Sequence, residues 1–196
     1  MADLDESKEL QADDKSAQKT VRMKKEIWEW AKSLFWAILL VFLVFQFVIK
    51  PVQVSGSSME PTLHNDDRLI VYQLLYEPKQ GDVVILDENS GLNEALVKRV
   101  IAVGGQTVDI DVDGNVWVDG KQLQEDYIQE QISDEMRGNQ DFPVTVPPKH
   151  IFVMGDNRNH STDSRDRRVG CVDTKDVVGK VVLRILPFDK IGLIHS

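Results

Sequence analysis

The chain has 196 residues, enough for one domain of ordinary size with appendages. Its formal net charge of −9 and its calculated pI of about 4.9 argue against a general nucleic-acid binder. The single cysteine, Cys171, excludes a disulfide within the chain and a zinc site built from cysteines. We interpret Cys171 as a small buried apolar residue, and we expect no metal and no cofactor.

The first 32 residues differ in composition between their two parts. Residues 1–20 are acidic, contain no aromatic side chain and have few large apolar ones. Such a segment cannot bury enough surface to offset the entropy lost on ordering, so we predict a disordered tail. The residues that follow, up to residue 32, are basic and include Trp28 and Trp30, which suit the headgroup region of a bilayer.

The segment from Ser33 to Ile49 carries no charge. As a helix of about 17 residues it would span roughly 25 Å, near the lower limit for crossing a bilayer core. A buried core helix is an alternative, but the segment is apolar on every face. A cleavable secretory signal is another, but the preceding tail is too long and acidic and no clear cleavage site follows. We predict a transmembrane helix at 33–50, ended by Pro51, with residues 1–32 in the cytoplasm because the flanking positive charge is N-terminal.

From residue 51 onward the pattern is typical of strands, and no long segment has a helical period. Four segments are rich in β-branched residues and are bounded by Gly, Pro or Asp. They are RLIVYQLLY (68–76), GDVVIL (81–86), EALVKRVIAV (94–103) and VVGKVVLRIL (177–186). We therefore predict a mainly β fold after the membrane segment.

Residues 107–119 read TVDIDVDGNVWVD, two alternating runs joined at Asp113-Gly114, which predicts a hairpin. Its three aspartates, spaced two apart before the glycine, copy the start of a helix–loop–helix calcium loop. The bidentate glutamate that such a loop needs at its twelfth position is replaced by Gly120, and no helices flank the segment. We prefer the hairpin without a metal, since alternation with valine and isoleucine accounts for the spacing.

A cluster of serines lies in residues 54–63, VSGSSMEPTL. An extended stretch that passes through Gly56 into a tight turn would present the Ser58 hydroxyl beside a free backbone N–H. Serines more often only cap and hydrate turns, and a serine is a poor nucleophile until a base removes its proton.

Two side chains could be that base. His160 with Asp163 would complete a Ser–His–Asp arrangement. Lys98 lies among apolar neighbours, and burial there would lower its pKa; a decrease of about 3 units costs roughly 4 kcal/mol. Most strand lysines are solvated, so the residues alone leave both bases open.

The chain resembles the bacterial type I signal peptidases, membrane-bound serine proteases with a Ser–Lys dyad, in their compact Gram-positive form. The matching blocks follow the membrane segment in order: SGSSMEPTL (55–63), GDVV (81–84), KRVIAVGG (98–105), GDNRNHSTDSR (155–165) and the C-terminal GKVVLRILP. The resemblance implies a single N-terminal transmembrane helix and an extracytoplasmic antiparallel β-sheet peptidase domain over 51–196. It also implies a smaller β insertion at about 106–150.

The resemblance also implies roles for individual residues. Ser58 matches the nucleophile and Lys98 the general base. Ser161 matches the serine that orients the lysine amine, and Asp163 matches the aspartate that organises the site.

Two charge pairs are implied as well, Asp163 with Arg165 and Asp156 with Arg99. His160 falls on a variable position, which weakens the histidine-based alternative.

One position departs from part of the family. Some members have a serine two positions before the nucleophile, whose hydroxyl serves the oxyanion hole, whereas this chain has Gly56. We expect the Ser58 backbone N–H and a further donor to form the hole, and we group Gly56 and Ser57 with this part of the site. Loss of one such donor typically costs about 10²–10³ in rate.

The implied activity is removal of signal peptides from exported preproteins, after small residues at positions −1 and −3, through an acyl-enzyme. A substrate strand would pair with residues 52–55 on one side and 95–97 on the other. The residues expected to line its apolar pockets are Val52, Val54, Met59, Leu63, Leu96 and Val97.

The implied partners are preprotein signal peptides, the lipid bilayer of the cell membrane and, by proximity, the secretion translocon, with no nucleic acid. The alternatives are a catalytically silent membrane-anchored β module, a cytosolic self-cleaving repressor-like Ser–Lys protease and a serine hydrolase based on His160.

Overall fold

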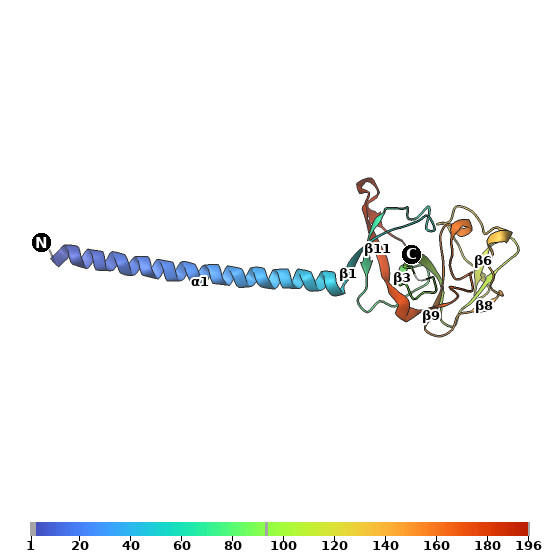
Figure 1. Cartoon of the computed structure of the whole chain (residues 1–196), viewed down its shortest axis with the longest axis horizontal. Coiled ribbons are helices and arrows are strands. Elements are labelled where there is room, and N and C mark those ends of the chain that lie inside the picture. Colours follow the sequence, from blue (N-terminus) through green and yellow to red (C-terminus); the bar gives the residue numbers. More distant parts are fainter. Residues whose placement is uncertain (1–2, 93, 196) are drawn as a thin grey trace. The chain divides into compact units, whose positions relative to one another are not determined.

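The computed structural model describes residues 3–92 and 94–195, with the side chains of 3–22, 24 and 47 left aside. The chain divides into two units, Met1–Gln46 and Phe47–Ser196. The first is helical and the second is built from strands (Figure 1). Each unit is described here by itself.

The helix α1 extends over Asp3–Phe47. We expected residues 1–20 to be disordered, whereas the helix already includes them from Asp3; residues 1 and 2 lie outside the described part. Low hydrophobicity argues against a packed core but not against a helix, and this segment is rich in Glu, Lys, Gln, Ala and Leu, which favour helices. It also extends an adjoining helical segment, so it needs no nucleus of its own.

Within the described residues, one helical stretch, Lys25–Gln46, is long and apolar enough to cross a membrane. Most of its large apolar side chains are exposed, with Trp30 at 79%. The helix ends at Phe47, not at residue 50 as predicted, because the chain then joins a sheet as strand β1 (Ile49–Gln53). Pro51 therefore lies within an edge strand, a position that tolerates its missing N–H.

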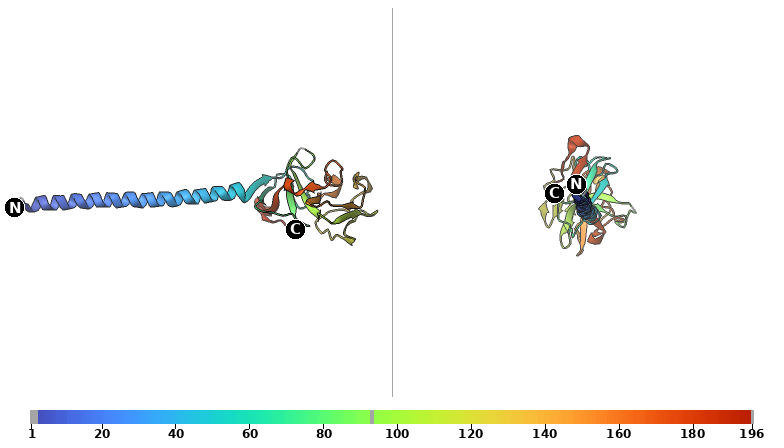
Figure 2. Two further views of the ribbon diagram at one scale, coloured as in Figure 1. Left: turned by 90° about the horizontal axis from the view of Figure 1, so that it is seen from below. Right: turned by 90° about the vertical axis from the view of Figure 1, so that its left-hand side faces the viewer.

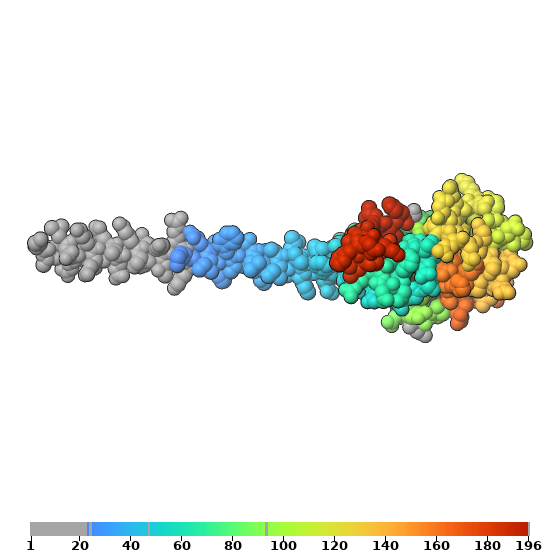
Figure 3. Space-filling view, turned by 90° about the horizontal axis from the view of Figure 1, so that it is seen from above, coloured from blue at the N-terminus to red at the C-terminus, as the bar shows by residue number. Residues whose placement is uncertain are grey.

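The larger sheet has eight strands, all paired antiparallel, in the order β1-β2-β11-β3-β4-β9-β10, with β12 paired to β11. Figures 1 and 2 show the strand-rich unit that contains this sheet. After β1, its strands are β2 (Arg68–Tyr72), β3 (Val83–Leu86), β4 (Leu96–Val103), β9 (His150–Met154), β10 (Val172–Asp173), β11 (Val177–Leu186) and β12 (Gly192–Leu193). In the space-filling view, the C-terminal residues, in red, lie beside residues of the β1–β2 region, in cyan to teal (Figure 3).

The smaller sheet has the order β7-β6-β5-β8. Its strands are β5 (Thr107–Ile110), β6 (Val116–Val118), β7 (Lys121–Gln122) and β8 (Val144–Thr145). Four short 3₁₀ helices complete the described elements: η1 (Asp134–Met136), η2 (Arg158–His160), η3 (Thr174–Asp176) and η4 (Phe188–Lys190). The prediction of a mainly β fold after one N-terminal apolar helix is confirmed.

The predicted strands differ in how well their ends agree with the structure. Strand β11 has the predicted bounds 177–186. The predicted strand 68–76 ends instead at Tyr72, and the turn beyond it places Leu75 at φ 51°, a left-handed conformation that no strand contains.

The predicted hairpin forms between β5 and β6, but its loop covers five residues, 111–115, and not only Asp113-Gly114. The Asp111 carboxylate accepts hydrogen bonds from the backbone and side chain of Asn115 and from Trp117 Nε1. The side-chain hydrogen bonds of Asn115 and Trp117 lower the pKa of Asp111 to about 2. A Cβ at Gly114 would lie 2.1 Å from the Ile132 carbonyl oxygen, which explains the glycine.

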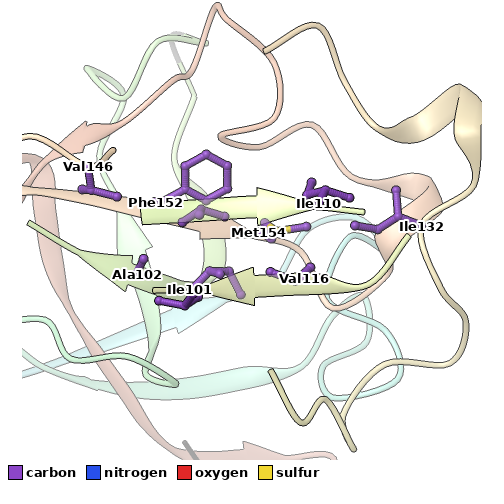
Figure 4. Packing of buried hydrophobic residues seen from close by; sticks show 10 residues of the cluster. Ile101, Ala102, Ile110, Val116, Ile132, Val146, Phe152 and Met154 are labelled. Atoms are coloured by element: carbon purple, nitrogen blue, oxygen red, sulfur yellow. The ribbon is translucent and has the colours of Figure 1, made fainter. Parts of the chain in front are cut away.

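The core follows the period of two expected for strands. On β9, Ile151 and Val153 belong to one buried cluster, whereas Phe152 and Met154 belong to another, which is packed against the smaller sheet (Figure 4). Cys171 is half-buried against this second cluster, and burial raises the pKa of its thiol. The larger sheet therefore has apolar packing on both faces, which stabilises the strands that hold the candidate site.

Candidate functional site

The serine turn follows β1 directly, and two buried residues hold it. Met59 and Leu63 are 1% and 0% exposed and pack in the core with Val54. The Leu63 N–H donates to the Met59 carbonyl at 2.9 Å, which closes the turn. Gly56 has φ 90°, a conformation that favours glycine, and its N–H donates to Asn65 Oδ1.

Lys98 lies on β4, paired with Val84 of β3, and is 2% exposed. Its Nζ is 2.8 Å from Ser58 Oγ and 3.0 Å from the Val97 carbonyl oxygen. A neutral amine has two N–H groups and one lone pair, so it can donate to Val97 while it accepts the Ser58 proton. The fold thus brings together two residues that are 40 positions apart in the chain.

Burial lowers the pKa of Lys98, because an ammonium loses its hydration inside the protein. The negative charges of Asp163 and Glu94 oppose this effect, and the positive charge of Arg165 adds to it. The arrangement therefore favours a neutral amine beside the serine hydroxyl, the protonation state that a general base needs.

Asp163 is buried, and five donors hold its carboxylate, one of which is the Arg165 backbone N–H at 3.3 Å. Arg165 Nε and Nη2 donate at 2.8 and 2.9 Å, the Gly155 N–H at 3.0 Å and the Ser161 hydroxyl at 2.7 Å. Burial by itself raises the pKa of Asp163, but the Arg165 charge and these hydrogen bonds hold it below its ordinary value. Asp163 is therefore an ionised group inside the protein.

Ser161 was expected to orient the lysine amine. In the structure its hydroxyl donates to Asp163, and among the described residues it has no hydrogen bond with Lys98. The reason is local, because Ser161 and Asp163 lie two positions apart on one loop and a buried carboxylate is a stronger hydrogen-bond acceptor than an amine.

Sequence reasoning missed the packing role of Gly155. A Cβ there would lie 2.4 Å from the Ser58 carbonyl oxygen and 2.3 Å from Ser161 Oγ. The following loop also holds the serine turn, since Asn157 donates its N–H to Ser58 O and its Nδ2 to Ser57 O, both at 3.1 Å. The glycine at the start of the GDNR block was the available signal for such a close approach.

The implied pair of Arg99 and Asp156 forms a buried two-pronged ion pair, with N–O distances of 2.9 and 2.8 Å. Thr62 Oγ1 donates to the same carboxylate at 2.5 Å, and the Arg99 guanidinium lies 3.9 Å from the centre of the Tyr127 ring. Arg99 also donates to the His195 carbonyl. This cluster links the serine turn, strand β4 and the loop that begins at Gly155. The contacts of Thr62 and Tyr127 had no signal in the sequence.

His160 is exposed and lies at the same opening as Ser58. Among the described residues its ring has no hydrogen bond with Ser58 or with Asp163, whose carboxylate is occupied by the donors described above. The arrangement needed for a Ser–His–Asp triad is not formed.

A groove of about 540 Å³ opens at Ser58 and Lys98. Its walls are residues 52–59 on one side and 94–98 on the other, with Ile85, His160 and Thr162. Five of the residues expected to line substrate pockets line this groove: Val52, Val54, Met59, Leu96 and Val97. Leu63 is an exception, because the turn that starts at Met59 directs it into the core, where it is 0% exposed.

Gly56 and Ser57 line the same groove. Strand β4 pairs with β9 only from Arg99 onward, so the described pairings leave Leu96–Lys98 without a strand on that side. Strand β1 is an edge strand. Both walls can therefore accept an added strand. Among the residues that the structure describes, no group of three or more His, Cys, Asp or Glu could hold a metal ion.

Comparison with known proteins gives a consistent result. A family model described as signal peptidase, peptidase S26, matches residues 27–186. Signal peptidase I of Bacillus licheniformis is 37% identical over 89% of this chain and 96% of its own length. Signal peptidase I P of Bacillus subtilis subsp. natto is 39% identical over 88% and 96%. A solved signal peptidase I from Enterococcus faecalis V583 matches 54% of this chain and 97% of that one, at 30% identity and a TM-score of 0.44. The chain therefore belongs to the peptidase S26 family of signal peptidases, which are serine endopeptidases.

Proposed function

We propose that this chain removes N-terminal signal peptides from exported preproteins, with Ser58 as nucleophile and Lys98 as general base. The observation that carries the proposal is the 2.8 Å separation of Ser58 Oγ and Lys98 Nζ, with the lysine 2% exposed. A hydroxyl and a dehydrated amine at hydrogen-bond distance satisfy the requirement for an activated nucleophile.

The reaction then has two steps. Lys98 accepts the Ser58 proton as Oγ attacks the scissile carbonyl carbon, and the resulting ammonium protonates the leaving amine, which leaves an acyl-enzyme. Neutral Lys98 next removes a proton from water as the water attacks the ester carbonyl, and the ammonium returns this proton to Ser58 Oγ as the signal peptide is released. Asp163 and Ser161 act as positioning residues. The Ser58 N–H and a second hydrogen-bond donor near Gly56 and Ser57 stabilise the oxyanion.

The apolar walls of the groove support the proposed specificity for small residues at −1 and −3. A substrate strand laid between the two walls would pair with the backbone of 52–55 and 95–97. The apolar side chains of these walls leave shallow pockets, which accept alanine and exclude larger side chains.

We further propose a single-pass topology in the cell membrane, with residues 1–32 in the cytoplasm and the β unit outside. The apolar stretch Lys25–Gln46 would cross the bilayer. Ser58 follows it by only 12 residues, so the groove would lie near the bilayer surface and close to the translocon from which preproteins emerge. Attachment of enzyme and substrate to one membrane would raise their effective concentration.

The test uses the full chain in detergent and a preprotein with an Ala-x-Ala boundary. Ser58→Ala and Lys98→Ala should each abolish cleavage, whereas His160→Ala should retain most of it. Loss of activity in His160→Ala with activity kept in Lys98→Ala would instead support the histidine-based hydrolase. A well-folded wild-type chain that leaves the preprotein uncut would support the catalytically silent module.

A further inference from the structure

The substrate groove contains few charges. Among its described lining residues only three side chains titrate: Glu94, Lys98 and His160. Every other lining residue is neutral, and most are apolar or are serine and glycine. The charge that a bound peptide meets is therefore set by very few groups.

The proposed mechanism needs a neutral Lys98, which would leave the acidic side chain of the groove unbalanced by that amine. Glu94 is exposed and is the one acidic side chain among the described residues that line the groove. Among the described residues its carboxylate forms no salt bridge with a lysine or arginine, so its charge is available to a ligand.

The position of Glu94 along the groove can be stated in substrate residues. It precedes Lys98 by four residues, a chain length of at most about 14 Å. A substrate strand advances about 3.3 Å per residue, so a residue about four positions from the scissile bond would lie opposite Glu94. In the proposed function, the −1 and −3 residues of the substrate lie between residues 52–55 and 95–97. The wall that leads from Lys98 to Glu94 is then on the signal-peptide side, so this contact would be upstream of the cleavage site.

We propose that Glu94 is a specificity-determining residue, which favours a cationic side chain about four residues before the cleavage site and disfavours an anionic one. This inference rests on the proposed function, because it assumes that the signal peptide lies in this groove. The contact is at the exposed edge of the groove, so its effect is of the size measured for solvent-exposed ion pairs, roughly twofold to fivefold in kcat/KM. Such an effect should weaken as salt is added.

The experiment uses peptides with an Ala-x-Ala boundary that carry Lys, Gln or Glu at each position from −2 to −6, cleaved by the full chain in detergent at pH 8. We expect wild type to rank Lys above Gln above Glu most strongly near −4, with the ranking compressed in 0.5 M salt. Glu94→Gln should abolish the ranking at that position, and Glu94→Lys should invert it.

Glu88→Lys is the matched control, since Glu88 is an exposed carboxylate that precedes the same strand and does not line the groove. It makes the same change in total charge, and we expect it to keep the wild-type ranking. If Glu88→Lys inverts the ranking as well, the preference comes from the net charge of the chain and the inference is overturned. An unchanged ranking in Glu94→Lys also overturns it. Cleavage of the peptides that carry Gln is the separate readout. If the wild type does not cleave them, the proposed function is contradicted. If it cleaves them but does not prefer Lys over Glu at any position, only this inference is contradicted.

Discussion

Addition of one methyl group at Gly155 should separate Ser58, the proposed nucleophile, from Lys98. The Cβ of an alanine there would lie 2.4 Å from the Ser58 carbonyl oxygen and 2.3 Å from Ser161 Oγ. Neither atom can move away freely, because Ser58 O accepts a hydrogen bond from Asn157 N at 3.1 Å and Ser161 Oγ donates to Asp163 at 2.7 Å. The clash therefore falls on both sides of the site at once.

The size of the effect follows from the geometry. Ordinary van der Waals contact begins at 3.4 Å. The Ser58 turn or the Gly155 loop must therefore move by about 1 Å, and misplacement of this size costs about 10²-fold in rate. We expect kcat/KM to fall by about 10²-fold in Gly155→Ala, equivalent to about 2.7 kcal/mol. Overpacking of the site should also lower the free energy of unfolding by about 1–3 kcal/mol.

The assay compares kcat/KM on an Ala-x-Ala peptide with thermal unfolding, both for the full chain in detergent. Gly192→Ala is the control, because a Cβ at Gly192 has no atom within 4 Å. It should keep wild-type activity and unfolding temperature. If Gly155→Ala remains folded and retains activity within a factor of three of wild type, the serine turn does not depend on this contact and the reasoning is refuted.

Three further predictions concern the charges at the site. First, kcat/KM should rise with pH as Lys98 loses its proton, with a pKa below 10.5 because burial lowers the Lys98 pKa. Asp163→Asn removes an anion that favours the ammonium form, so the rise in the pH–rate profile should shift to lower pH. A shift to higher pH would contradict this prediction. Second, Arg99→Lys cannot replace the two-pronged pair with Asp156 and should reduce stability by about 2–5 kcal/mol in denaturant titrations; an unchanged midpoint would refute it. Third, Lys98→Met should abolish cleavage yet stabilise the fold by about 1–4 kcal/mol at neutral pH. Because the folded-state pKa of Lys98 is lowered, the free energy of unfolding of the wild type should rise as the pH approaches 10.5. The difference in this free energy between Lys98→Met and the wild type should shrink over the same pH range. A variant less stable than wild type at neutral pH would show that the lysine is not a destabilising group.

The parts of the fold that could be predicted depend on local patterns. Strand β11 has ten residues, of which five are valine or isoleucine with strong β propensity, and the structure has a strand with the predicted bounds. The hairpin at 107–119 was predicted from alternation and an Asp-Gly pair, although the loop proved longer because Asp111 organises a wider turn. The N-terminal helix is longer than predicted, because composition distinguishes packed from unpacked segments better than it distinguishes helix from coil.

The parts of the site that could not be predicted depend on tertiary placement. Residue types suggested Ser58 and Lys98, but their separation of 2.8 Å requires the register of β4 against β3 and the buried contacts below the turn. Leu63 illustrates the same limit: an apolar residue five positions after Ser58 could line a pocket or anchor the turn, and only the path of the backbone places it in the core. The stacking of Tyr127 on Arg99 joins a residue of the loop after β7 to strand β4 and has no local pattern at all.

The pairing of Asp163 with Arg165 has a physical consequence for the base. An unpaired buried carboxylate near Lys98 would favour its ammonium form and would oppose the effect of burial. Arg165 donates to the same carboxylate and acts on the Lys98 pKa in the opposite direction, less strongly than Asp163, so the pair favours the ammonium form less than Asp163 alone would. Asp163 can therefore anchor Ser161 and the Gly155 backbone through charge-assisted hydrogen bonds while Arg165 offsets part of its effect on the lysine. A neutral hydrogen-bonding side chain in place of Asp163 would leave the Arg165 charge uncompensated and would lower the Lys98 pKa further, but it would weaken the hydrogen bonds that hold Ser161 and Gly155.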